Sequence, residues 1–119
     1  MTYVSYAGIY TPTVSISTNV SNYTVHPCQY MRVLNTVTVS GKIGIDTNTT
    51  GDYSINLSLP YPSNFTDEVQ CSGVCASAGH NEYPPHISAD VVKNEAVLSG
   101  NDNDSSMHDH YFIFTYTLV

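Results

Sequence analysis

The clearest pattern in the chain is an alternation of hydrophobic and polar residues between positions 29 and 46. A period of two over this length, rich in β-branched residues, is typical of strands with one face buried and the other in water. Leu34-Asn35 interrupts the alternation and predicts a two-residue hairpin turn, in which asparagine tolerates a positive φ and leucine is strained. Gly41 falls on the hydrophobic side, which indicates a bulge or the close approach of another backbone. The predicted buried face carries Val37, Val39, Ile43 and Ile45.

Shorter stretches with the same period lie on both sides of this hairpin, and no stretch has a helical period. Clusters of Asp, Asn, Ser, Thr and Gly at 46–52 and 100–106 are typical turn sequences. We therefore predict an all-β fold, an antiparallel β-sandwich of jelly-roll type with about eight strands. Residues 1–10 are expected to form an N-terminal arm and residues 11–119 a single domain. The additional strands are predicted within 14–25 (one bulged strand or two short ones), 53–59, 86–90, 96–98 and 110–119.

The last predicted strand is hydrophobic on both faces, and the N-terminal arm contains three tyrosines. One layer of a sandwich buries only one side of a strand completely, so the second side needs another partner. Aromatic residues in a short terminal arm are more often docked on a neighbour than exposed to water. We therefore expect a homo-oligomer closed around a symmetry axis. The candidate interface residues are Tyr3, Tyr6, Tyr10, Phe112, Phe114 and Tyr116.

Charge, hydrophobicity and cysteine content limit the partners and the cellular environment that we expect for this chain. The formal net charge is −7, with only 3 Lys and Arg, which argues against a nucleic-acid partner. No hydrophobic run approaches 18 residues and the start lacks signal-peptide features, so neither a membrane span nor export by that route is expected. Three cysteines indicate buried thiols in a reducing cytosol. The alternative is a metal site formed by Cys71, Cys75 and His80, which would require a turn at Gly73.

Two groups of residues could bind a ligand. His108 and His110 would project to one face of an extended strand about 7 Å apart, so three such pairs could surround an axial metal ion in a trimer. Such an ion would be released as pH falls through about 6. The alternative is that these histidines are polar residues that open a strand. The loop at 76–86 could recognise a sugar or a partner, or could be an ordinary loop stiffened by prolines; its candidate residues are His80, Asn81, Tyr83 and His86.

Signatures of catalysis are missing from the sequence. It contains no nucleophile elbow, phosphate-binding glycine loop or zinc-hydrolase motif. The acidic pairs at 46 and 52 and at 102 and 104 lie in typical polar turns and lack the closing glutamate of a calcium loop. The chain also has no Trp to serve as a sugar-binding platform beside an acid. We therefore expect no enzymatic activity and no resident cofactor; the alternative is a small carbohydrate-active enzyme.

The hairpin also resembles a known sequence pattern. Its run QYMRVLNTVTVSGKI at 29–43 resembles the YxRVGNxVTVSGxV hairpin of small β-sandwich domains in bacteriophage virion proteins, on tail fibres or on heads. The lead-in TPT at 11–13, SLPYPSNF at 58–65 and the final YFIFTYTLV are similar too, so the resemblance spans most of the chain from about residue 10. It departs at Leu34, where the pattern has glycine.

The resemblance implies a location and a class of function. It implies a non-enzymatic structural or interaction protein on the virion surface, assembled in the host cytoplasm and often trimeric. Such a domain would be a fibre-type adhesin or a capsid decoration protein. Its partners would be other virion proteins, the viral shell or a host surface glycan.

Overall fold

The structure is a computed structural model that describes residues 5–77 and 84–119. This part of the chain contains ten β-strands, a short 3-10 helix and no α-helix, which confirms the predicted all-β class. The strand count is higher than the predicted eight, because two segments with small residues and weak alternation also form strands, β1 and β7. The strands are β1 (Ser5–Tyr10), β2 (Val14–Thr18), β3 (Val20–Val25), β4 (Cys28–Val33), β5 (Thr36–Thr47), β6 (Gly51–Leu57), β7 (Cys71–Ser77), β8 (His86–Asp90), β9 (Glu95–Asp102) and β10 (His108–Thr117), with the 3-10 helix η1 at Glu68–Gln70.

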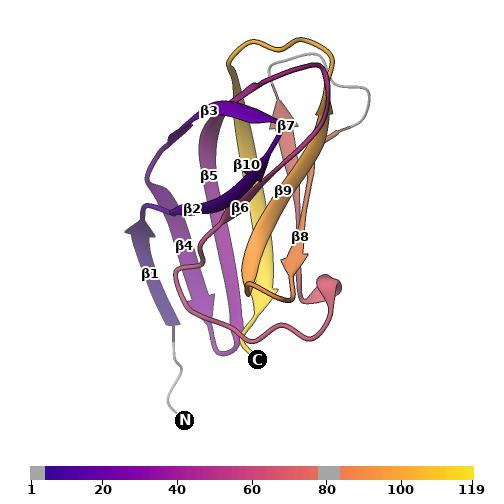
Figure 1. The fold of residues 1–119 in the computed structure, drawn as a ribbon. Coiled ribbons are helices and arrows are strands. Elements are labelled where there is room, and N and C mark those ends of the chain that lie inside the picture. The colour runs from indigo at the N-terminus through magenta and orange to yellow at the C-terminus, as the bar shows by residue number, and fades with distance from the viewer. Residues whose placement is uncertain (1–4, 78–83) are drawn as a thin grey trace.

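All ten strands belong to one curled antiparallel sheet. Neighbouring strands follow the order β1-β4-β5-β10-β7-β8-β9-β6-β2, and β3 pairs with β5. In Figure 1, β2, β6 and β9 lie in front of β5 and β10, because the sheet curls back over itself. The stretch formed by β2 and β3 pairs with β6 at one end and β5 at the other, so it links the two layers. The prediction of an antiparallel sheet is confirmed, whereas the jelly-roll connectivity is not.

Strand β5 organises the sheet. Its first half pairs with β4, its second half pairs with β3, and β10 pairs with residues 36–45 on the other edge. Pro27 separates β3 from β4, since proline cannot donate to a strand ladder. Gly41 lies at the change of partner, where an added Cβ would clash with Cys28 Sγ and come within 3.2 Å of the Phe112 ring. Gly41 is therefore closely packed, but by the side chains of Cys28 and Phe112 and not by another backbone, which the sequence predicts for a strand without a bulge.

The core lies between the two layers, and β5 and β10 supply much of it. The four residues predicted to share the buried face of β5 are 1% exposed or less. Phe112, Phe114 and Tyr116 also point into this core, with neighbouring ring centroids 6.0 and 6.2 Å apart. These three rings were predicted at a subunit interface, but the curl of the sheet buries them within their own chain. On the opposite face of β10, Tyr111 and Ile113 are exposed instead.

The predicted N-terminal arm forms a strand of the chain's own sheet. Residues Ser5–Tyr10 pair with β4, which places Tyr6 opposite Arg32 and Tyr10 opposite Cys28. The Tyr10 hydroxyl donates a hydrogen bond to the Ser58 carbonyl at 3.1 Å, and burial raises the pKa of this phenol. Tyr10 is therefore held by its own chain and not by a neighbouring subunit, whereas Tyr6 is exposed. Tyr3 lies outside the described residues.

The turn between β4 and β5 has the strain predicted at Leu34 but not the positive φ expected of Asn35. Val33 pairs with Thr36, so Leu34 and Asn35 are the two central residues as predicted. Leu34 has φ 55°, and Asn35 is not among the residues with positive φ. A leucine therefore occupies a left-handed conformation that glycine adopts without cost. This is also the position at which the resembled phage pattern has glycine.

Replacing Leu34 by glycine should stabilise the protein. The Leu34 side chain is largely exposed, so little packing is lost and the strain of its positive φ is relieved. We expect the free energy of unfolding to rise by about 0.5–1 kcal/mol after the entropy cost of glycine is subtracted. Asn35→Gly is the matched control and should lower stability, since Asn35 has no strain to relieve. Urea unfolding of both variants measures the difference, and destabilisation by Leu34→Gly would contradict the prediction.

Candidate functional site

The outer face of β1, β4, β5, β10 and β7 is the most distinctive surface of the described chain. The strand register places six exposed hydrophobic side chains on this face, which turns away from β6 and β9. We call this surface the outer patch. Small and hydroxyl residues such as Ala7, Thr38, Ser40 and Thr115 lie between the hydrophobic ones. The six exposed hydrophobic residues are Ile9, Met31, Val33, Val74, Tyr111 and Ile113.

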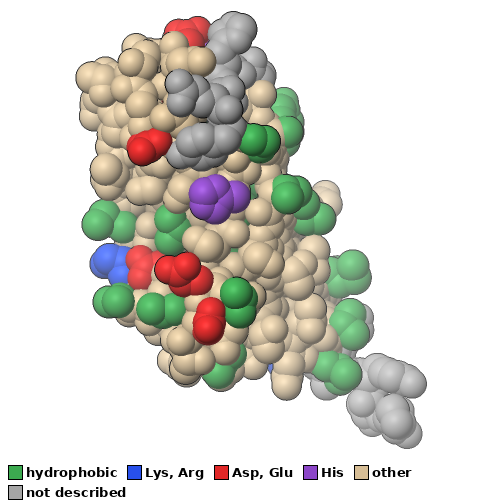
Figure 2. All heavy atoms as spheres, turned by 90° about the vertical axis from the view of Figure 1, so that its right-hand side faces the viewer, with side chains coloured by type: hydrophobic (Ala, Val, Ile, Leu, Met, Phe, Trp, Pro, Cys, Tyr) green, Lys and Arg blue, Asp and Glu red, His purple; other side chains and the backbone are tan. Residues whose placement is uncertain are grey.

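Among the residues that the structure describes, the outer patch contains no carboxylate. Lys42 is its one charged residue, and its ammonium lies 5.9 Å from the centre of the Tyr111 ring. Carboxylates on this side of the sheet begin at Asp109, one cross-strand row beyond Tyr111. In Figure 2, hydrophobic side chains protrude along the right-hand margin, and the acidic side chains visible in that view lie to the left of them. A chain with net charge −7 thus keeps one large face almost free of charge.

A groove crosses the outer patch beside the edge strand β1. It has a volume of about 600 Å³, and its lining includes Gly8, Ile9, Met31, Ser40 and Ile113. Edge strand β1 carries no charged residue and no proline, the features that usually protect a free edge from pairing with another chain. The groove and the adjacent edge are therefore suited to contact with another protein surface.

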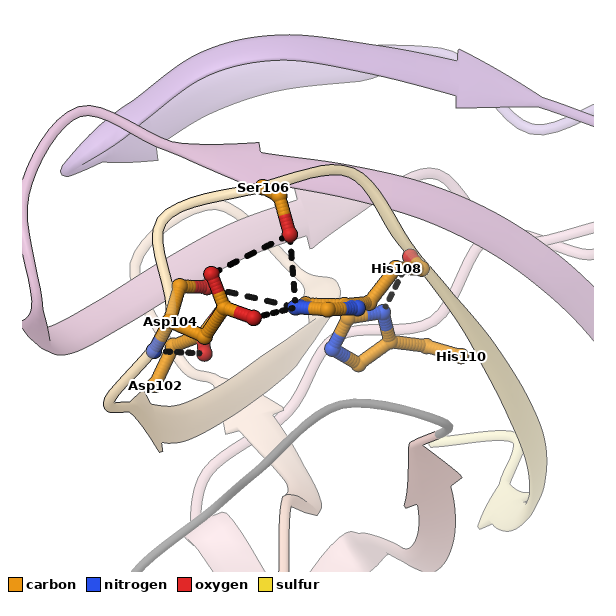
Figure 3. Close-up of polar contacts among 5 residues, drawn as sticks. All are labelled: Asp102, Asp104, Ser106, His108 and His110. Atoms are coloured by element: carbon orange, nitrogen blue, oxygen red, sulfur yellow. Dashed lines mark hydrogen bonds and ion pairs between the residues drawn. The ribbon is translucent and has the colours of Figure 1, made fainter.

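His108 and His110 share the inner face of β10, as predicted, but each has a hydrogen-bonding role (Figure 3). His110 is buried, and its Nδ1 donates to the His108 carbonyl at 2.9 Å because a carbonyl can only accept. Its Nε2 therefore accepts the Tyr53 hydroxyl at 2.8 Å. His108 Nε2 lies 3.2 Å from the Asp104 carbonyl oxygen and 3.3 Å from Ser106 Oγ. An axial metal ion would have to displace Tyr53 from His110.

Metal binding at these histidines stays a prediction. Among the described residues, no group of three or more His, Cys, Asp and Glu side chains is placed to hold a metal ion. Asp104 Oδ2 is 3.8 Å from His108 Nε2, and Asp102 accepts the backbone N–H of Asp104 at 2.9 Å (Figure 3). These contacts close the β9–β10 turn, so Asp102 and Asp104 have the turn role that the sequence indicated.

His110 should make the protein less stable in weak acid. Burial lowers its pKa from the ordinary 6.5, so the unfolded chain takes up a proton at a higher pH than the folded chain does. The contribution of neutral His110 to stability is complete above pH 6.5 and is lost as pH falls from 6.5 to the folded pKa. We expect the thermal midpoint to fall between pH 7.5 and pH 5.5, and to fall less in His110→Gln. His86→Gln, at an exposed histidine, should retain the wild-type slope; an unchanged slope in His110→Gln would contradict the assignment.

The predicted ligand-binding loop can be assessed at one position only. His80, Asn81 and Tyr83 lie outside the described residues. His86 begins β8, is exposed and pairs with Val74 and Ser99 across the neighbouring strands. The structure therefore places His86 at the border of the outer patch, and the role of the loop stays a prediction.

All three cysteines are buried free thiols, as the sequence indicated. Burial raises the pKa of Cys28 to about 11 and the pKa values of Cys71 and Cys75 to about 12. Each thiol is therefore protonated at neutral pH and packs as a small hydrophobic group. The alternative metal site also needs His80, which lies outside the described residues.

Two acidic side chains lie together at the β8–β9 turn. Asp90 and Glu95 pair across β8 and β9 and both accept from Asn56 Nδ2, at 2.9 and 3.4 Å. The backbone N–H of Lys93, followed by the Asn56 amide, holds the pKa of Asp90 below its usual value. Asp90 is thus kept ionised, whereas the general acid of a glycosidase needs a raised pKa.

One cluster was missed by the sequence reasoning. Arg32, the only arginine in the chain, lies over the Tyr61 ring, with 4.9 Å between Cζ and the ring centroid. Tyr30 packs edge-on against Tyr61 at 5.5 Å. The alternation within the hairpin could have placed Tyr30 and Arg32 on one face. Tyr61 comes from a loop about thirty residues away, so only the tertiary structure brings it to Arg32.

Comparisons with known proteins identify no relative of this chain. No protein-family model, curated protein or solved structure matches this chain. Within the described residues, no helix has the length and hydrophobicity needed to cross a membrane.

Proposed function

We propose that this protein is a non-enzymatic structural and interaction protein on the surface of a bacteriophage virion. The outer patch carries the proposal, since a broad hydrophobic face without carboxylates is suited to docking against another virion protein or a second copy of the chain. The resemblance of the hairpin at 29–43 to phage surface domains supports the location. The proposal includes a jelly-roll-type sandwich, as in those domains, and assembly in the reducing host cytoplasm, with which three free thiols agree.

Within this role we distinguish two positions on the particle. A capsid decoration protein would cover the outer patch with the viral shell. A fibre-type adhesin would cover it with neighbouring subunits and turn another surface toward a host glycan. Labelling this protein on purified particles and locating it by electron microscopy separates head from tail. Its absence from particles would overturn the proposed function.

The proposal includes a homotrimer, a number that comes from the resemblance. The contact would use the outer patch, since the core rings of β10 are occupied within the chain. Sedimentation at micromolar concentration should give three times the 13.0 kDa of one chain. Ile113→Glu, on the outer patch, should release monomers, whereas Val92→Glu, 87% exposed in the β8–β9 turn, should not. A wild-type monomer would overturn the trimer.

Reaction products distinguish the proposed interaction protein from the alternative, a carbohydrate-active enzyme. Purified protein is incubated with host surface glycans, and the glycans are analysed by mass spectrometry. Binding without cleavage is expected of the interaction protein. Shortened glycans would overturn the non-enzymatic assignment.

A further inference from the structure

A guanidinium group and three tyrosine side chains lie on the side of β1 and β4 opposite the outer patch. Tyr6 and Arg32 are direct neighbours across these strands, and Tyr6 is 54% exposed. Residues 58–63 approach the same side, because the Tyr10 hydroxyl bonds to Ser58 and the Arg32 guanidinium lies over Tyr61. The four side chains Tyr6, Tyr30, Arg32 and Tyr61 are called the Arg32 cluster.

Arg32 has no carboxylate partner in the described chain. No described Asp or Glu pairs with Arg32, although the sequence has 10 Asp and Glu for 3 Lys and Arg. The Arg32 Nε donates to the Leu34 carbonyl at 2.8 Å. A guanidinium has five N–H donors, so the group retains capacity for an external acceptor. In a chain this acidic, an arginine without a carboxylate partner points to a ligand that supplies the carboxylate.

The cluster holds its groups in place before any ligand arrives. Stacking on Tyr61 and the bond to Leu34 restrict the Arg32 side chain, which lowers the entropy lost on binding. The Tyr30 ring lies across Gly8, where an added Cβ would come within 2.6 Å of its hydroxyl. Tyr10 packs against Tyr30 with 6.0 Å between ring centroids. Three separate segments of the chain therefore position one cation among aromatic rings.

The combination of a guanidinium group with tyrosine rings favours one chemical class of ligand. A planar guanidinium recognises a carboxylate through two parallel hydrogen bonds. Tyrosine offers an apolar ring face and a hydroxyl, which match the C–H face and hydroxyl groups of a sugar ring. We propose that the Arg32 cluster binds a carboxylate-bearing saccharide of the uronic-acid type. This inference rests on the proposed role as a surface-binding module, and it names the glycan class.

The net charge of −7 opposes an acidic ligand at long range. At physiological ionic strength, however, charges more than about 8 Å apart are largely screened. Contact with the unpaired guanidinium then decides the affinity.

The test uses the purified chain and two probes. Isothermal titration with trigalacturonic acid should show binding, and the neutral galactose trisaccharide should bind at least about tenfold more weakly. Arg32→Gln should weaken binding of the acidic probe by about tenfold or more, and Tyr6→Ala, at an exposed ring, should weaken it severalfold. Thermal melts establish that each variant is folded. Absence of binding, or equal binding of the neutral probe, would overturn the proposal.

Lys42→Gln is the matched control. It removes the same charge from another cation that faces a tyrosine ring, but on the outer patch. Affinity for trigalacturonic acid should be unchanged; a loss equal to that of Arg32→Gln would assign the binding to overall charge and overturn the site. The outcome is independent of particle labelling, because a protein found on virions without uronate affinity refutes only this inference. Uronate binding by a protein absent from virions refutes only the virion role.

Discussion

Truncating Phe114 to alanine should lower the free energy of unfolding by about 3–5 kcal/mol. Phe114 is 1% exposed and lies between Phe112 and Tyr116 in the core, so its removal leaves a cavity among rigid rings. A loss of this size approaches the whole stability of a small domain. Urea unfolding monitored by circular dichroism gives the value.

Ile113→Ala is the control for this variant on the same strand. Its side chain lies on the outer patch and is 47% exposed, so truncation should cost less than about 1 kcal/mol in the monomer. The two variants together test which face of β10 is internal. Equal losses, or a larger loss at Ile113, would contradict the burial that excludes Phe114 from a subunit interface.

Introducing a methyl group at Gly73 should be the second most damaging change. Its Cβ would clash with the Ile113 carbonyl oxygen and lie 2.5 Å from Phe114 Cβ, so two strands would have to separate. Overpacking a core typically costs about 1–3 kcal/mol, and a clash with backbone atoms puts Gly73→Ala at the upper end of this range. We expect Gly73→Ala to lower the urea midpoint strongly, with an accompanying loss of folded protein on expression.

Gly44→Ala provides the comparison in β5. The nearest contact of its added Cβ is the sulfur of Met107 at 3.1 Å, the end of a flexible side chain that can move. Stability should stay within about 0.5 kcal/mol of wild type, since the entropic advantage of alanine offsets the small adjustment. If both glycine variants were equally tolerated, the close approach of β10 at Gly73 would be wrong.

Much of the local structure could be predicted from single residues. Alternation identified the buried face of β5. Gly41 was expected to mark a bulge or the approach of another backbone, whereas its lack of a side chain admits the side chains of Cys28 and Phe112. The strand β7 was not recognised as such, because Gly73, Ala76 and neighbouring serines give little periodic contrast. A sequence pattern detects a strand only when its two faces differ in polarity.

The candidate sites were less predictable than the strands, because they depend on contacts between different segments of the chain. His108 and His110 were placed correctly on one face, but Tyr53, which bonds to His110, lies 57 residues away in the sequence and reaches it only through the fold. The Arg32 cluster was invisible because Tyr61 belongs to a loop with no pattern that links it to β4. Contacts between segments distant in sequence depend on how the whole sheet curls.

The sequence by itself determined the all-β class, the central hairpin, the buried thiols and the acidic character of the chain, because these depend on residue type and a period of two. Only the tertiary structure decided which apolar face of β10 is internal. Both faces are apolar in sequence, and the curl of β6 and β9 over one of them buries Phe112, Phe114 and Tyr116. The same curl leaves Tyr111 and Ile113 on the outer patch. Pairing of β1 with β4 likewise turned an expected arm into an edge strand, since backbone hydrogen bonds to a neighbouring strand leave no mark in composition.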